Sequence, residues 1–80
     1  MNTHQEKILA ILNSIRPEYD FGASEDFVEE RLLDSFDIVT LVSELEDAYD
    51  VVIDGLDIVP ENFSTIDAII ETVKRNGGAL

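Results

Sequence analysis

Apolar residues recur at helical spacing near the start of the chain. They lie three and four positions apart, as on one face of a helix: Ile8, Ile11, Leu12 and Ile15. Pro17 cannot continue the pattern, because it has no backbone N–H and disfavours helical geometry in the residue before it. We therefore predict a first helix over residues 3–16.

The most regular pattern occupies the middle of the chain. One sector of a helical wheel collects Ile38, Leu41, Val42, Leu45 and Tyr49. Asp34 is a good N-cap, and Asp37 can complete a weaker form of the capping box. Both acids also suit the positive end of the helix dipole. This pattern predicts a second helix over residues 34–50.

A third apolar pattern, Ile66, Ile69, Ile70 and Val73, predicts a last helix over residues 64–76. Ser64 and Asp67 form a plausible cap at its start, and Asn76 with Gly77 ends it. The segment before it could be read as a strand, but a lone strand has nothing to pair with. We predict a loop there with one short helix at about residues 56–61.

Residues 17–33 have no regular period, yet they contain too many apolar residues for a free linker: Phe21, Phe27, Leu32 and Leu33. We expect this loop to pack on the helices. Residues 1–80 are thus predicted to form a single all-α domain, a small four-helix bundle with three main helices, one short helix and a long first loop. A chain of this size has little room for an enclosed active site.

The charge balance narrows the classes of partner. Eighteen acidic residues against 5 basic ones give a formal net charge of -13, without a basic run. Nucleic acid is therefore an unsuitable partner, whereas proteins with basic docking patches are favoured. The N-terminal stretch fits neither a signal peptide nor a membrane span, so we expect a cytoplasmic protein.

Catalytic chemistry lacks its usual residues. The chain has no cysteine and a single histidine, His4, near the N-terminus. Zinc sites, cysteine nucleophiles and a Ser-His-Asp triad are therefore unsupported, and we predict neither an enzyme nor a metal site.

Ser35 stands between Asp34 and Phe36 at the start of the second helix. A serine in the first turn beside an Asp cap can be purely structural. No GxSxG elbow or partner histidine is present to make it a nucleophile. A modified serine remains, because the start of a helix favours an attached phosphate.

The side of the second helix opposite its core face mixes apolar and polar residues: Phe36, Val39, Thr40, Ser43, Glu46 and Asp47. A solvated face would be polar throughout, so Phe36 and Val39 are candidate contact residues. Alternatively, Phe36 folds back under the preceding loop. The sequence leaves both arrangements open.

The stretch LLDSFDIVTLVSELEDAYDVVI resembles the phosphopantetheine attachment region of acyl carrier proteins, whose common core is Asp-Ser-Leu. IVPENFSTIDAIIETV matches that family's third and fourth helices in spacing, and the resemblance covers about residues 5–75. It implies that Ser35 carries 4'-phosphopantetheine, added from coenzyme A by a Mg2+-dependent phosphopantetheinyl transferase. The thiol of that arm would carry an acyl or aminoacyl group as a thioester. The implied partner surface is Asp34, Phe36, Asp37, Val39, Thr40, Ser43, Glu46 and Asp47.

The chain departs from the family pattern at a few positions. Phe36 replaces the usual leucine, Thr40 is uncharged where many fatty-acid carriers have an acid, and Arg31 and Leu33 occupy places where a glycine is frequent. The motif is also similar to that of D-alanyl carrier proteins and of stand-alone carriers in specialised pathways. The cargo therefore stays open among fatty acid, D-alanine, polyketide and peptide. We expect a monomer that meets a transferase, a loading ligase and acyl-transfer enzymes.

Two other functions compete with the carrier. Asp50, Asp54, Gly55 and Glu61 occupy positions 1, 5, 6 and 12 of an EF-hand loop, but position 3 is Val52, so calcium binding is the weaker reading. The chain could also be an acidic adaptor that binds a basic protein through its second helix without modification of the serine.

Overall fold

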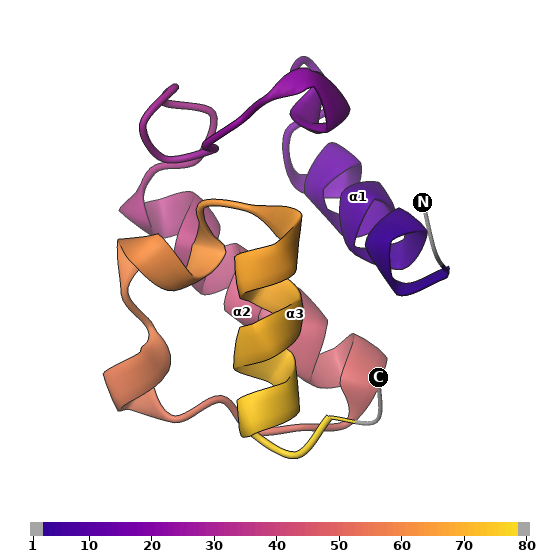
Figure 1. Ribbon diagram of the computed structural model, residues 1–80, viewed down its shortest axis with the longest axis vertical. Coiled ribbons are helices and arrows are strands. Elements are labelled where there is room, and N and C mark those ends of the chain that lie inside the picture. Colours follow the sequence, from indigo (N-terminus) through magenta and orange to yellow (C-terminus); the bar gives the residue numbers. More distant parts are fainter. Residues whose placement is uncertain (1–2, 79–80) are drawn as a thin grey trace.

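The computed structural model describes residues 3–78, and within that range its regular secondary structure is all helical, with no strand, which confirms the predicted fold class. The helices are α1 (Thr3–Ile15), α2 (Ser35–Tyr49) and α3 (Ile66–Arg75), joined by the 3-10 turns η1 (Phe21–Ala23), η2 (Gly55–Asp57) and η3 (Pro60–Phe63) (Figure 1). None of the described helices has the length and apolar character needed to cross a membrane.

Helix α1 holds the bundle together, because it packs against both α2 and α3. The turn η3 packs in turn against α2 and α3. The side chains with no exposed surface come from all four elements: Ile8, Leu12, Leu41, Leu45, Phe63, Ile69, Thr72 and Val73. This shared core fixes the direction of α2 and therefore the position of its first turn.

The long loop between α1 and α2 packs onto the bundle as expected. Phe21 and Phe27 are each 1% exposed, and their rings meet edge to face with centroids 5.3 Å apart. The backbone N–H of Phe27 donates to the carbonyl of Ser64 at 2.7 Å, which ties the loop to the start of α3. The apolar residues of an irregular segment thus supply part of the core.

The segment expected to hold one short helix at residues 56–61 forms two separate 3-10 turns, η2 and η3. Val59 lies between them in an extended conformation, with φ -130° and ψ 150°. Pro60 accounts for the break, because proline disfavours helical geometry in the residue before it and donates no backbone hydrogen bond.

Helix α3 begins later than predicted. Its N-cap is Thr65, whose hydroxyl accepts a hydrogen bond from the N–H of Ala68 at 3.0 Å. Ser64, the predicted cap, instead donates its hydroxyl to the carbonyl of Glu61 at 3.1 Å. Either hydroxyl residue could cap the helix. Ser64 still has the αR backbone at the end of η3, whereas Thr65 has the extended backbone of an N-cap.

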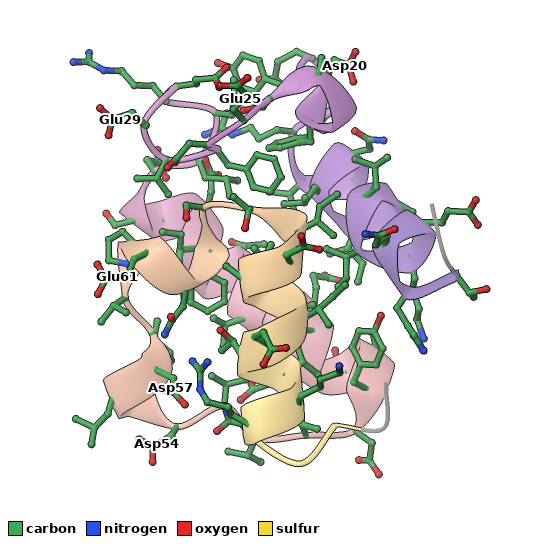
Figure 2. The ribbon with its side chains drawn as sticks, in the orientation of Figure 1. Asp20, Glu25, Glu29, Asp54, Asp57 and Glu61 are labelled. Carbon is green, nitrogen blue, oxygen red and sulfur yellow. The ribbon has the colours of Figure 1, made fainter. Side chains whose placement is uncertain are left out.

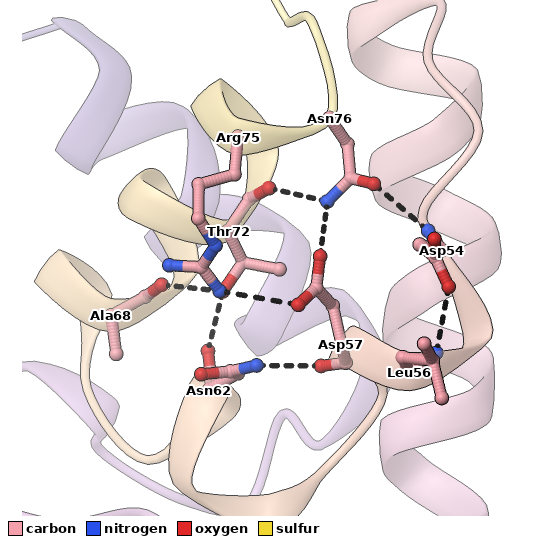
Figure 3. Close-up of polar contacts among 8 residues, drawn as sticks. All are labelled: Asp54, Leu56, Asp57, Asn62, Ala68, Thr72, Arg75 and Asn76. Atoms are coloured by element: carbon pink, nitrogen blue, oxygen red, sulfur yellow. Dashed lines mark hydrogen bonds and ion pairs between the residues drawn. The ribbon is translucent and has the colours of Figure 1, made fainter.

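The loop after α2 is fastened to the end of α3 by polar side chains (Figure 3). The amide nitrogen of Asn76 donates to a carboxylate oxygen of Asp57 at 3.0 Å and to the carbonyl of Thr72 at 2.8 Å. Its amide oxygen accepts from the N–H of Asp54 at 2.9 Å. We call Asn76, Asp54 and Asp57 the Asn76 clamp; it holds η2 against α3.

The residues of the possible EF-hand are used within the fold. Asp50 caps the C-terminus of α2 in a left-handed conformation with φ 53°. The carboxylate of Asp54 accepts from the N–H of Leu56 at 2.9 Å and so caps η2. Throughout residues 3–78, no three histidine, aspartate or glutamate side chains are grouped so that they could hold a metal ion.

Candidate functional site

Ser35 is the first residue of α2 and is exposed. A complete capping box surrounds it. The carboxylate of Asp34 accepts from the N–H of Asp37 at 2.8 Å, and the carboxylate of Asp37 accepts from the N–H of Asp34 at 3.2 Å. The two acids that flank the serine therefore rigidify the first turn of the helix, as the sequence predicted.

Arg16, the first residue after α1, contacts both acids of this box. Its Nε donates to Asp37 Oδ2 at 3.0 Å, and its Nη2 lies 3.7 Å from Asp34 Oδ2. Its Nη1 lies 3.5 Å from a carboxylate oxygen of Glu18. One guanidinium thus joins the end of α1 to the start of α2.

These contacts shift two pKa values. The pKa of Asp34 is lowered, chiefly because its carboxylate accepts the backbone N–H of Asp37, and the charge of Arg16 adds to the effect. The pKa of Arg16 is raised, first by its hydrogen bond to Asp37 and then by the charge of that carboxylate. Both groups therefore stay ionised at neutral pH.

An apolar hollow of about 200 Å³ opens beside Ser35. It is lined by Ser35, Ile38, Val39, Ile58 and Pro60. Two elements form it: the first turns of α2, and the segment that leads from η2 into η3. The hollow therefore places an apolar surface next to the serine.

The outward side of α2 is apolar next to Ser35. Phe36 is 80% exposed and Val39 is 64% exposed, so Phe36 does not fold under the preceding loop. Ser43 and Asp47 are exposed farther along the helix, and Thr40, partly buried, donates its hydroxyl to the carbonyl of Phe36 at 3.3 Å. An exposed aromatic residue beside an aliphatic one is the surface expected of a contact site.

Two residues of the expected partner surface are engaged within the fold. Asp37 is only 6% exposed, since its carboxylate is held by the capping box and Arg16. Glu46 is partly buried and accepts from the N–H of Ile53 at 3.0 Å. A helical wheel cannot show these roles, because both depend on segments outside the helix.

Acidic side chains are spread widely over the rest of the molecule. Figure 2 shows Asp20, Glu25 and Glu29 on the loop before α2, with Asp54, Asp57 and Glu61 on the turns after it. The acidic field therefore extends well beyond α2, and it favours encounter with basic protein surfaces.

Arg31, on the loop before α2, has a left-handed backbone with φ 62°. This conformation is readily adopted by glycine and is uncommon for other residues. Arg31 therefore adopts a glycine-like backbone at one of the two positions where the sequence analysis expected a glycine to be frequent.

Comparison with known families agrees with this geometry. A family model described as the phosphopantetheine attachment site matches residues 6–73. The chain belongs to this phosphopantetheine-attachment family. No curated protein and no solved structure gives a significant match. The resemblance to acyl carrier proteins is thereby confirmed at the level of the family, and the chain is a carrier of covalent 4'-phosphopantetheine.

The residues at the start of α2 fit that group. Attachment through a phosphodiester requires an accessible hydroxyl and space beside it, and Ser35 is exposed and borders the apolar hollow. Sequence reasoning missed Arg16, Ile58 and Pro60 as parts of this region. No local signal in the sequence placed any of these three residues beside the serine.

Proposed function

We propose that Ser35 is the attachment residue and that the chain shuttles an acyl or aminoacyl thioester between biosynthetic enzymes. The observation that carries this proposal is the exposed serine at the first position of α2, framed by the capping box of Asp34 and Asp37. When bound, phosphopantetheine supplies the thiol that a chain without cysteine lacks. Carrier domains generally hold and present a group without catalysing its transfer.

The chain's own residues present the attached group. The first turn of α2 offers the phosphate a favourable helix dipole, and the capping box, which uses the N–H of Asp37, keeps that turn in one conformation. The hollow bordered by Ile58 and Pro60 offers apolar contact to the part of the arm nearest the serine. The bundle therefore acts as a rigid mount.

The proposed partners are a phosphopantetheinyl transferase, a loading ligase and acyl-transfer enzymes, met in the cytoplasm. Phe36 and Val39 form the apolar centre of the proposed docking surface, and Asp34, Ser43 and Asp47 form its exposed polar rim. Basic residues on a partner would face this rim. Such docking should be fast and should weaken as salt is raised.

The deciding experiment is the intact mass of the protein after incubation with coenzyme A, Mg2+ and a broad-specificity phosphopantetheinyl transferase. The wild type should gain one phosphopantetheine, and Ser35→Ala should gain none. Ser14→Ala is the matched control, because Ser14 is an exposed serine on α1, outside the proposed docking surface; it should be modified like the wild type. Modification of Ser35→Ala would refute the assignment of the serine.

A further inference from the structure

Arg16 is not on α2, yet it contacts the two carboxylates at the start of that helix, Asp34 and Asp37, together with Glu18 on its own segment. Its strongest contact is with Asp37 Oδ2, which also accepts the N–H of Asp34. A single carboxylate oxygen therefore closes the cap of α2 and receives the anchor from the end of α1. Asp37 is only 6% exposed. The two groups that donate to this oxygen, the guanidinium of Arg16 and the N–H of Asp34, are therefore held in a fixed arrangement.

The contacts of Arg16 also matter for the negative charge that surrounds Ser35. Asp34 and Asp37 are both close to the serine, and a phosphodiester would add a further negative charge there. Arg16 offsets one of the two carboxylate charges and directs both carboxylates toward itself. Without it, the two acids would repel each other and the incoming phosphate.

We propose that Arg16 is a positioning residue for the attachment reaction: through Asp37 and Asp34 it fixes the first turn of α2, so that the hydroxyl of Ser35 is held ready for phosphate transfer. This inference rests on the proposed attachment at Ser35. Arg16 touches neither coenzyme A nor the reacting atoms, and it acts only through the two aspartates.

The step that Arg16 prepares takes place on the transferase. The Ser35 hydroxyl gives its proton to a base of that enzyme, and its oxygen bonds to the phosphorus on the pantetheine side of coenzyme A. The P–O bond of the pyrophosphate breaks, and adenosine 3',5'-bisphosphate leaves. A serine held in the wrong orientation slows this step more than it weakens docking, so the loss should fall on kcat.

The test measures kcat and KM of a phosphopantetheinyl transferase with the carrier varied, at a temperature well below every melting midpoint. Arg16→Gln removes the charge and the anchor, and Arg16→Lys restores the charge alone. Arg75→Gln is the matched control, because Arg75 is also paired, with Asp57 Oδ1 at 3.6 Å, but lies at the end of α3. It removes the same charge from the molecule.

We expect Arg16→Gln to lower kcat roughly tenfold or more with little change in KM, Arg16→Lys to recover part of kcat, and Arg75→Gln to match the wild type. If Arg16→Gln matches Arg75→Gln, or if only its KM changes, the inference is overturned. If Arg16→Gln does not fold, the kcat of Arg16→Lys decides alone, and a wild-type value overturns the inference. Modification of Ser35→Ala would instead show that the proposed attachment residue is wrong.

Discussion

Replacing Phe36 by alanine should weaken docking without weakening the fold. The side chain is 80% exposed, so folding buries little of it. Surface substitutions of this kind usually change the free energy of unfolding by less than about 0.5 kcal/mol. The same exposure means that most of the ring is available to a partner.

The size of the docking loss follows from the area of the ring. An aromatic side chain buries roughly 200 Å² at an interface. With 80% of it still exposed, about 160 Å² is available, which at ~25 cal/mol per Å² corresponds to an upper limit of about 4 kcal/mol. Alanine keeps the β-carbon, and ordering the ring costs part of the gain, so we expect a loss of about 2 kcal/mol, or roughly 30-fold in affinity.

The assay is the KM of a phosphopantetheinyl transferase for the carrier, measured together with urea unfolding of each variant. Val52→Ala is the control, because Val52 is 81% exposed but lies beyond the C-terminal end of α2. Its KM should stay at the wild-type value. An unchanged KM for Phe36→Ala would refute the docking surface, and a loss of more than about 1.5 kcal/mol in stability would refute the exposed placement of the ring.

Three further predictions concern the fold. The hydroxyl of Tyr49 is buried, which raises its pKa, and it has no hydrogen-bond partner among the described residues. Tyr49→Phe should therefore raise the free energy of unfolding, measured in urea, by about 1 kcal/mol. A loss of stability would reveal a partner. The pKa of Asp34 is lowered by folding, so its charge stabilises the fold above the unfolded value of about 3.9 and this contribution is lost as pH falls through the folded pKa. Because asparagine also caps helices, the stability difference between wild type and Asp34→Asn should be constant from about pH 7 to 5 and shrink below about pH 4; a difference that grows in acid contradicts this. Asn76→Ala should lower the free energy of unfolding by about 1 to 3 kcal/mol and speed hydrogen exchange of the Asp54 N–H. Unchanged exchange would show that the Asn76 clamp does not hold the loop.

The three main helices could be predicted because the spacing of apolar residues is a local property of the chain. The capping box was predictable for the same reason, since Asp34 and Asp37 are three residues apart. The splitting of the short helix was also available in principle from Pro60, whose effect on the preceding residue is local.

The remaining features depend on contacts between segments that are far apart in sequence. Arg16 could pair with several acids, and only the packing of α1 on α2 selects Asp37, 21 residues away. The exposure of Phe36 likewise depends on where residues 17–33 pack. Glu46 lies on the outward side of the helical wheel. Its carboxylate nevertheless accepts a hydrogen bond from the N–H of Ile53, because the chain after α2 folds back toward the helix.

The Asn76 clamp also sets an order of events during synthesis of the chain. Residues 54 and 57 are made about 20 residues before the asparagine that holds them. Until Asn76 has been added and α3 has packed, η2 lacks its anchor, and the neighbouring Ile58 is not held beside the serine. A nascent chain that already contains the complete α2 therefore still lacks the finished hollow. The surroundings of Ser35 are therefore complete only after synthesis has passed residue 76, well after α2 itself has been made.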